Sequence, residues 1–141
     1  RLSGKNGHQY AVVYLITQLK EKNYDFIEQE MAGIVEKCRG AGVISKVIFE
    51  NCYLTEEEKR ALCSIAREVR PDFIKTSTGF GTGGATFEDV ALMKKCVGDE
   101  VKIKAAGGIR TLEEAQTYLE LGADRIGSSG LVALVQAQSN G

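Results

Sequence analysis

The sequence is poor in residues that bind metals. It has one histidine, His8, and its four cysteines, Cys38, Cys52, Cys63 and Cys96, form no C-x-x-C pair. This pattern argues against a zinc site and against a thioredoxin-type redox motif. A single histidine near the end of the chain also leaves little basis for a Cys/His or Ser/His nucleophile pair. We therefore expect no metal and no other cofactor, a solvent-exposed histidine, and reduced cysteines that serve as small core residues.

Long apolar runs and an excess of one charge are also absent. No stretch approaches the roughly 18 apolar residues needed to span a bilayer, and the first residues do not resemble a signal peptide. The chain has 18 basic and 19 acidic residues, with the two signs interspersed, so no basic stripe is available for a nucleic acid. With 141 residues, of which 43% are hydrophobic, it can form one globular domain. We expect a cytoplasmic protein with no membrane or nucleic-acid partner.

The sequence does contain a regular alternation of short apolar runs and longer amphipathic segments. The apolar runs predict buried strands over residues 10–16, 45–49, 72–76, 101–105 and 125–127. Three threonines, each followed three residues later by an acidic residue, predict helix starts at Thr55, Thr86 and Thr111. Glycines 40, 42, 98 and 122 stand where helices are expected to end. This βα alternation predicts a parallel sheet with right-handed crossovers.

Three lysines recur at a constant interval. Lys46, Lys75 and Lys104 are 29 residues apart, and each lies in a predicted strand. Because neighbouring strands are about 4.8 Å apart, ammonium groups at equivalent heights repel each other, and the repulsion lowers the pKa of at least one. An uncharged lysine is a nucleophile that forms a Schiff base with a carbonyl. The alternative is that each lysine extends from a strand end into solvent and covers apolar surface with its stem.

Corners rich in glycine and hydroxyl residues follow three of the predicted strands. In the segment 104–111, KAAGGIRT, Gly107 and Gly108 precede Arg110 and a helix start, so backbone N–H groups can approach an anion closely. The segments 76–79, TSTG, and 127–130, GSSG, are similar corners. Together they predict a phosphate site made of amides, hydroxyls and Arg110. A tight turn alone would also favour glycine at each corner.

These motifs resemble those of deoxyribose-phosphate aldolase, a class I aldolase family built as a (β/α)8 barrel. The resemblance rests on FIKTSTGF at 73–80, GGAT at 83–86, KAAGGIRT at 104–111 and RIGSS at 125–129, and it extends through SKVIFE at 45–50. It implies an α/β fold, a partial TIM (β/α)8 barrel that holds the last five βα units, because a complete barrel needs about 220 to 250 residues. We expect one domain over residues 1–141, with residues 1–20 atypical for the family.

The resemblance implies reversible Schiff-base cleavage of 2-deoxy-D-ribose 5-phosphate, a small phosphorylated sugar, into acetaldehyde and D-glyceraldehyde 3-phosphate. By this resemblance, Lys75 corresponds to the Schiff-base lysine, Lys104 to a second lysine that perturbs it, and Lys46 to a further active-site lysine. It implies that the substrate phosphate is bound by Gly79, Gly107, Gly108, Arg110, Gly127, Ser128 and Ser129.

The chain also departs from the family pattern. Ala11 stands where the resemblance expects an aspartate that relays protons, and a partial barrel leaves open strand edges that favour pairing with a second copy or another fragment. Two alternatives to an active aldolase therefore stay open. One is a catalytically impaired half-barrel that binds phosphate. The other is an isomerase or synthase barrel with Glu50 or Cys52 as its base.

Overall fold

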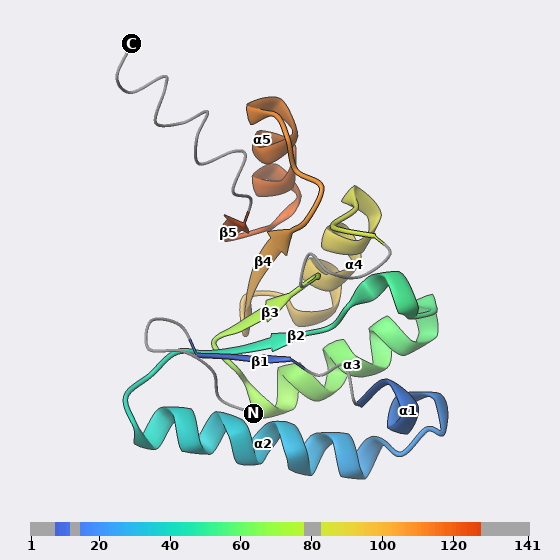
Figure 1. Ribbon diagram of the computed structural model, residues 1–141, viewed down its shortest axis with the longest axis vertical. Helices are drawn as coiled ribbons and strands as arrows, with labels where there is room; N and C mark the ends of the chain where they lie inside the picture. Colours follow the sequence, from blue (N-terminus) through green and yellow to red (C-terminus); the bar gives the residue numbers. More distant parts are fainter. Residues whose placement is uncertain (1–7, 12–14, 78–82, 128–141) are drawn as a thin grey trace.

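Five parallel strands pair in the order in which they occur along the chain. They form the sheet of the computed structural model, which describes residues 8–11, 15–77 and 83–127 (Figure 1). The strands are β1 (His8–Ala11), β2 (Ser45–Ile48), β3 (Phe73–Lys75), β4 (Lys102–Ala106) and β5 (Arg125–Gly127). The helices are α1 (Leu15–Lys20), α2 (Tyr24–Gly40), α3 (Glu56–Val69), α4 (Phe87–Val97) and α5 (Leu112–Leu121), with a short 3₁₀ turn, η1 (Asn51–Tyr53), after β2. The predicted parallel α/β arrangement is confirmed.

The two faces of the sheet have different surroundings. Val47, Ile74 and Ile103 occupy the centres of their strands, are fully buried, and belong to the hydrophobic core. That core also contains apolar residues of the helices, because right-handed crossovers between neighbouring strands place every helix on the same side of the sheet. Side chains alternate along a strand, so the neighbours of these core residues point to the opposite, inner face.

The predicted helix starts and ends are confirmed. Thr55 accepts a hydrogen bond from the Glu58 backbone N–H at 3.2 Å, and the Glu58 carboxylate accepts one from the Thr55 N–H at 2.8 Å. This reciprocal pair satisfies backbone donors that have no partner within the helix. Thr86 and Thr111 also cap their helices, α4 and α5, because each side chain accepts a hydrogen bond from the backbone N–H three residues later. Glycines follow the last residues of α4 and α5 at positions 98 and 122.

The strand predicted over residues 10–16 is wrong at residues 15 and 16, which belong to a helix. The strand β1 ends at Ala11, and Leu15 begins the helix α1. Leu19 of this helix is buried in the core. A short apolar run fits a buried helical turn as well as a strand, so its periodicity could not separate the two. Two helices, α1 and α2, therefore separate β1 from β2 where the sequence predicted one.

At the amino-terminal edge of the sheet, aspartates form hydrogen bonds to the neighbouring strands. The Asp72 carboxylate accepts from the backbone N–H of Ser45 at 2.9 Å, and the Asp72 N–H donates to the Ser45 hydroxyl at 2.9 Å. The Asp124 carboxylate accepts from the Ile103 N–H at 2.9 Å. These aspartates join neighbouring strands and so have a structural role. The polar side chains left to build a site lie farther along the inner face and at the carboxyl edge.

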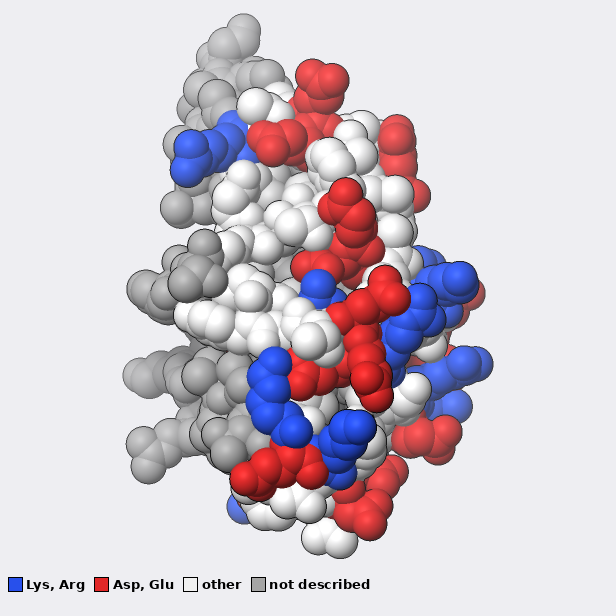
Figure 2. Space-filling view, turned by 90° about the vertical axis from the view of Figure 1, so that its right-hand side faces the viewer, with Lys and Arg blue, Asp and Glu red and all other residues white. Residues whose placement is uncertain are grey.

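The expectation of core cysteines is confirmed for Cys38 and Cys63, whereas Cys96 is half-buried and Cys52 is exposed. The side chain of His8 lies outside what the structure describes. Among the described helices, none has the length and apolar character to cross a membrane. On the outer face of the helices, Figure 2 shows acidic and basic side chains mixed together, as the sequence predicted.

Candidate active site

The strand register brings two of the three predicted lysines side by side. Lys75 of β3 pairs directly with Lys104 of β4, and Lys104 pairs with Arg125 of β5. On the other side, Lys75 pairs with Ile48 of β2, which pairs with Ala11 of β1. These residues form one row across the sheet, and the row lies near the carboxyl ends of the strands. Ala11, where the resemblance expects an aspartate, thus occupies the first position in the row of Lys75.

Equal spacing suggested that Lys46 lies at the same height on the sheet as the other two lysines, but it does not. It pairs with Phe73, so it lies two residues before the row of Lys75. Strands in a barrel are staggered, and the segments between them differ in conformation, so equal sequence spacing does not give equal height. An offset of two residues nevertheless keeps Lys46 on the inner face with Lys75 and Lys104.

Burial and neighbouring charge act together on the paired lysines. Lys75 is only 8% exposed, and burial followed by the positive charge of Lys46 lowers its pKa, against an opposing effect of Glu50. Burial also lowers the pKa of Lys104, with further lowering by Lys46, Lys75 and Arg125. The direction agrees with the sequence expectation, although burial is the largest cause at both lysines. Each amine is therefore uncharged at lower pH than an exposed lysine.

Glu50 is a carboxylate whose position sequence reasoning did not anticipate. It follows β2 in a left-handed conformation, with φ 54°, and is 3% exposed. The sequence suggested Glu50 only as the base of a rival chemistry, together with Cys52. In the structure its charge favours the protonated form of Lys75. Only the fold could show this, because the approach of the Glu50 charge to Lys75 depends on the bend of the chain after β2.

The corners after β3 and β4 contact each other closely. The backbone N–H of Ala85 donates to the carbonyl oxygens of Ala106 at 3.0 Å and Gly107 at 3.1 Å. A Cβ at Gly84 would lie 2.3 Å from the Gly107 oxygen, so only glycine fits at this approach. The Thr76 hydroxyl donates to the Ala106 carbonyl and accepts from the Ala106 N–H. Thr76 and Gly84 thus hold the corner in place, and the sequence had shown them only as parts of motifs.

The residues predicted to bind phosphate are only partly described. Gly107 and Gly108 have positive φ angles of 87° and 76°, and Gly108 and Arg110 are exposed to solvent after β4. The backbone N–H of Arg110 donates to the Glu114 carboxylate at 3.3 Å. Gly127 ends β5 in the strand beside them. The remaining predicted residues, Gly79, Ser128 and Ser129, lie outside the described residues.

Gly127 also makes room for a lysine. A Cβ at this position would lie 2.8 Å from Cε of Lys104 and 3.6 Å from its Nζ. We expect Gly127→Ala to displace the end of the Lys104 side chain rather than to unfold the protein, because that end is flexible. The expected result is an altered dependence of Lys104 amine reactivity on pH, with little change in melting temperature. An unchanged Lys104 reactivity in a folded variant would contradict this packing.

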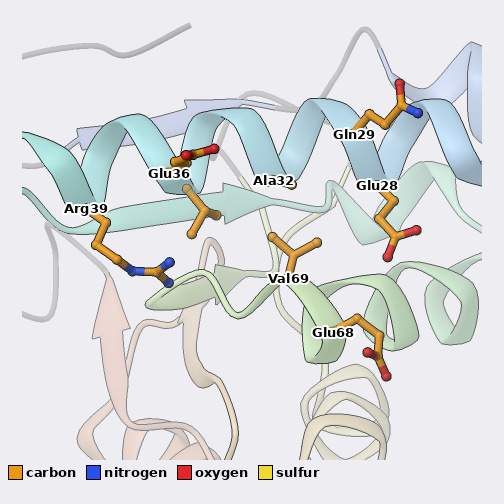
Figure 3. Close-up of a pocket in the computed structure, with 8 residues that line it drawn as sticks. Glu28, Gln29, Ala32, Glu36, Arg39, Glu68 and Val69 are labelled. Carbon is orange, nitrogen blue, oxygen red and sulfur yellow. The ribbon is translucent and has the colours of Figure 1, made fainter.

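A groove on the outer surface does not suit a sugar phosphate. It encloses about 510 Å³ and is lined by residues of α2 and α3. Figure 3 shows the carboxylates of Glu28, Glu36 and Glu68 around it, with Arg39 as the basic residue among the lining side chains. Three acids would repel an anion, and the groove lies on the helices, away from the inner face of the sheet. The inner face and carboxyl edge of the sheet are the better candidate site.

Comparisons with known proteins find aldolases among both the curated proteins and the solved structures. No family model matches the chain. The deoxyribose-phosphate aldolase of Lactobacillus acidophilus is 58% identical over 134 residues, which cover 94% of this chain and 56% of that protein. A solved aldolase named QR15 matches with a TM-score of 0.75 and 43% identity over 82% of this chain and 51% of that one.

A further solved structure, the tetrameric deoxyribose phosphate aldolase of Aeropyrum pernix, matches with a TM-score of 0.73 and 29% identity. It covers 82% of this chain and 50% of that one. The chain spans a little more than half the length of the curated relatives that it matches. It covers 56% of the Lactobacillus acidophilus protein and 60% of the Bacillus subtilis one. These likenesses confirm the partial barrel.

Proposed function

Since the chain belongs to the deoxyribose-phosphate aldolase family by its sequence, we propose that it is a class I aldolase. Its reaction is the reversible cleavage of 2-deoxy-D-ribose 5-phosphate into acetaldehyde and D-glyceraldehyde 3-phosphate. The observation that carries the proposal is the pairing of Lys75 with Lys104 on neighbouring strands, each with a lowered pKa. This is the arrangement that keeps an amine uncharged and nucleophilic.

In this reaction the uncharged amine of Lys75 attacks the aldehyde carbon of the open-chain sugar. The resulting carbinolamine loses water, and an iminium forms between Lys75 and the sugar. Removal of the proton from the C3 hydroxyl breaks the C2–C3 bond, whose electron pair passes into the iminium to give an enamine. Glyceraldehyde 3-phosphate departs, the enamine carbon takes up a proton, and water releases acetaldehyde and free Lys75.

Neighbouring charges assist these steps. Lys104 lies beside Lys75 in the register, and its lowered pKa suits it to exchange protons with the reacting groups. The iminium carries a positive charge on the Lys75 nitrogen that the free amine lacks, and the Glu50 carboxylate, which favours positive charge on Lys75, stabilises it. Lys46 disfavours protonation of the free amine and so keeps Lys75 ready to attack.

We assign the substrate phosphate to the corners at the carboxyl edge. Gly107 and Gly108 lack a Cβ and can bring backbone N–H groups close to an anion, and exposed Arg110 supplies a positive charge. The family resemblance adds Gly127, Gly79, Ser128 and Ser129 to the same site. Within the described residues, β1 and β5 each pair with one strand, so we also propose that copies associate through these edges. The cytoplasm is the proposed location.

Borohydride trapping tests the proposed function. The chain is incubated with acetaldehyde or with deoxyribose 5-phosphate and then reduced, which converts an iminium into a stable secondary amine. We expect intact-mass and peptide analysis to locate the adduct on Lys75. A folded sample that forms no adduct with either compound would overturn the proposal, as would an adduct spread evenly over the exposed lysines.

A further inference from the structure

An aromatic ring on the inner face of the sheet is surrounded by cations. Phe73 begins β3 and is 2% exposed, yet it does not belong to the core between the sheet and the helices. The Nζ atoms of Lys46 and Lys102 lie 5.9 and 5.7 Å from the centre of its ring. The Arg125 guanidinium carbon lies 4.9 Å from the same centre.

The register explains how one ring reaches three cations. Phe73 pairs with Lys46 on one side and with Lys102 on the other, and Arg125 extends over the ring from the next strand, β5. A cation within about 6 Å of a ring centre is attracted by the negative face of the ring. The apolar stems of such side chains can pack against a ring while their charged ends stay in water. Without such an attraction, three like charges would separate towards solvent.

Two of these cations also act on the proposed reactive lysines. Lys46 lowers the pKa of both Lys75 and Lys104, and Arg125 lowers that of Lys104. The other charged groups that bear on the pair are Glu50, which favours protonated Lys75, and Lys75 itself, which disfavours protonated Lys104. The positions of Lys46 and Arg125 therefore influence how readily the pair gives up protons.

We propose that Phe73 is a positioning residue whose ring holds Lys46 and Arg125 on the inner face beside Lys75 and Lys104. Its importance for catalysis rests on the proposed function, whereas its effect on the two amines does not. If the ring is removed, the freed cations extend into solvent, where water weakens their effect on the amines. Lys75 and Lys104 then hold their protons to higher pH, and a smaller fraction of each is nucleophilic near neutral pH.

Competitive labelling of the amines with acetic anhydride tests the proposal without any aldolase chemistry. The full chain receives a trace of deuterated reagent at each pH, then is unfolded and labelled to completion with the ordinary reagent. Mass analysis of peptides gives the reactivity of each lysine against pH. For Phe73→Leu we expect the midpoints of Lys75 and Lys104 to move up by about half a unit to one unit.

Three controls separate positioning from general damage. Phe73→Tyr keeps a ring and should retain the original midpoints, and Phe87→Leu removes a ring that contacts Tyr118 and should not move them. In a Lys46→Met/Arg125→Met background, Phe73→Leu should cause no further shift, because no released cation remains to act on the pair. Phe73→Met, whose flexible side chain fills similar volume, provides the same test if the leucine variant does not fold.

Unchanged midpoints in a folded Phe73→Leu or Phe73→Met variant would overturn the inference, as would an equal shift in the background that lacks both cations. The outcome is distinct from that of trapping. A midpoint shift without any borohydride adduct in the unmodified chain would support the role of Phe73 and reject the aldolase. A borohydride adduct without a midpoint shift would support the aldolase and reject the role of Phe73.

Discussion

Replacing Lys75 by methionine is expected to abolish the borohydride-trapped adduct and all turnover of deoxyribose 5-phosphate. Methionine fills similar space but has no amine to attack the aldehyde, so the covalent route is lost. Lys75 is repelled by Lys46 and attracted by Glu50, so denaturant unfolding is measured first to show that the variant is folded. The measurement is intact mass after trapping, with Lys95→Met, an exposed lysine on α4, as the matched control that should form the adduct normally.

Lys104→Met should behave differently from Lys75→Met. The nucleophile is present, so an adduct still forms, but the proposed proton exchange is lost, and turnover should fall by about 10² to 10⁴. A Lys75→Met chain that still gives an adduct on the inner face would contradict the assignment of the nucleophile. Equal loss of adduct in both variants would mean that the two amines cannot be separated into nucleophile and proton carrier.

The pH dependence of trapping follows from the same assignment. The uncharged amine attacks, so the initial rate of adduct formation should rise as pH increases through the pKa of Lys75. That pKa is lowered from the ordinary lysine value of 10.5, chiefly by burial, so the rise should be complete at lower pH than for an exposed lysine. A rise centred at 10.5 would show that burial and Lys46 do not act on Lys75 as the geometry indicates.

Gly84→Ala should be the most damaging change at the carboxyl edge. The added Cβ would meet the Gly107 backbone oxygen at 2.3 Å, and backbone cannot move aside as the end of a side chain can. The segment around Gly84 must then shift, weakening the hydrogen bonds from the Ala85 N–H and the one that the Ala85 oxygen accepts from the Tyr118 hydroxyl at 2.9 Å. We expect the free energy of unfolding to fall by about 1–3 kcal/mol.

The affinity of Gly84→Ala for phosphate should also fall, because the displaced backbone at Gly107 belongs to the proposed phosphate site. Denaturant unfolding and calorimetry with inorganic phosphate measure the two effects. Gly33→Ala in α2 is the matched control, since nothing lies within 4 Å of its added Cβ, and it should stabilise the helix by about 0.5–1 kcal/mol. A Gly84→Ala variant as stable and as phosphate-competent as this control would refute the close approach of the two corners.

The local signals in the sequence were sufficient for most of the elements. Interactions within a few residues determine most of these elements. They set the strands from residue 45 onward, the helix starts at Thr55, Thr86 and Thr111, and the glycines that end α4 and α5. The motifs around Lys75 and Lys104 also sufficed to recognise the family. The apolar run at 10–16 misled because strand and buried helix place similar demands on a short segment.

Only the tertiary structure decided which side chains share a height on the sheet and which charges face them. The sequence interval placed Lys46 level with Lys75, but the register sets it beside Phe73. The influence of Glu50 on Lys75 and the three cations around Phe73 depend on chain bends and strand pairing between distant segments. Sequence spacing fixes the face on which a strand residue lies, because side chains alternate. It does not fix the stagger between strands, which depends on how the whole sheet pairs and packs.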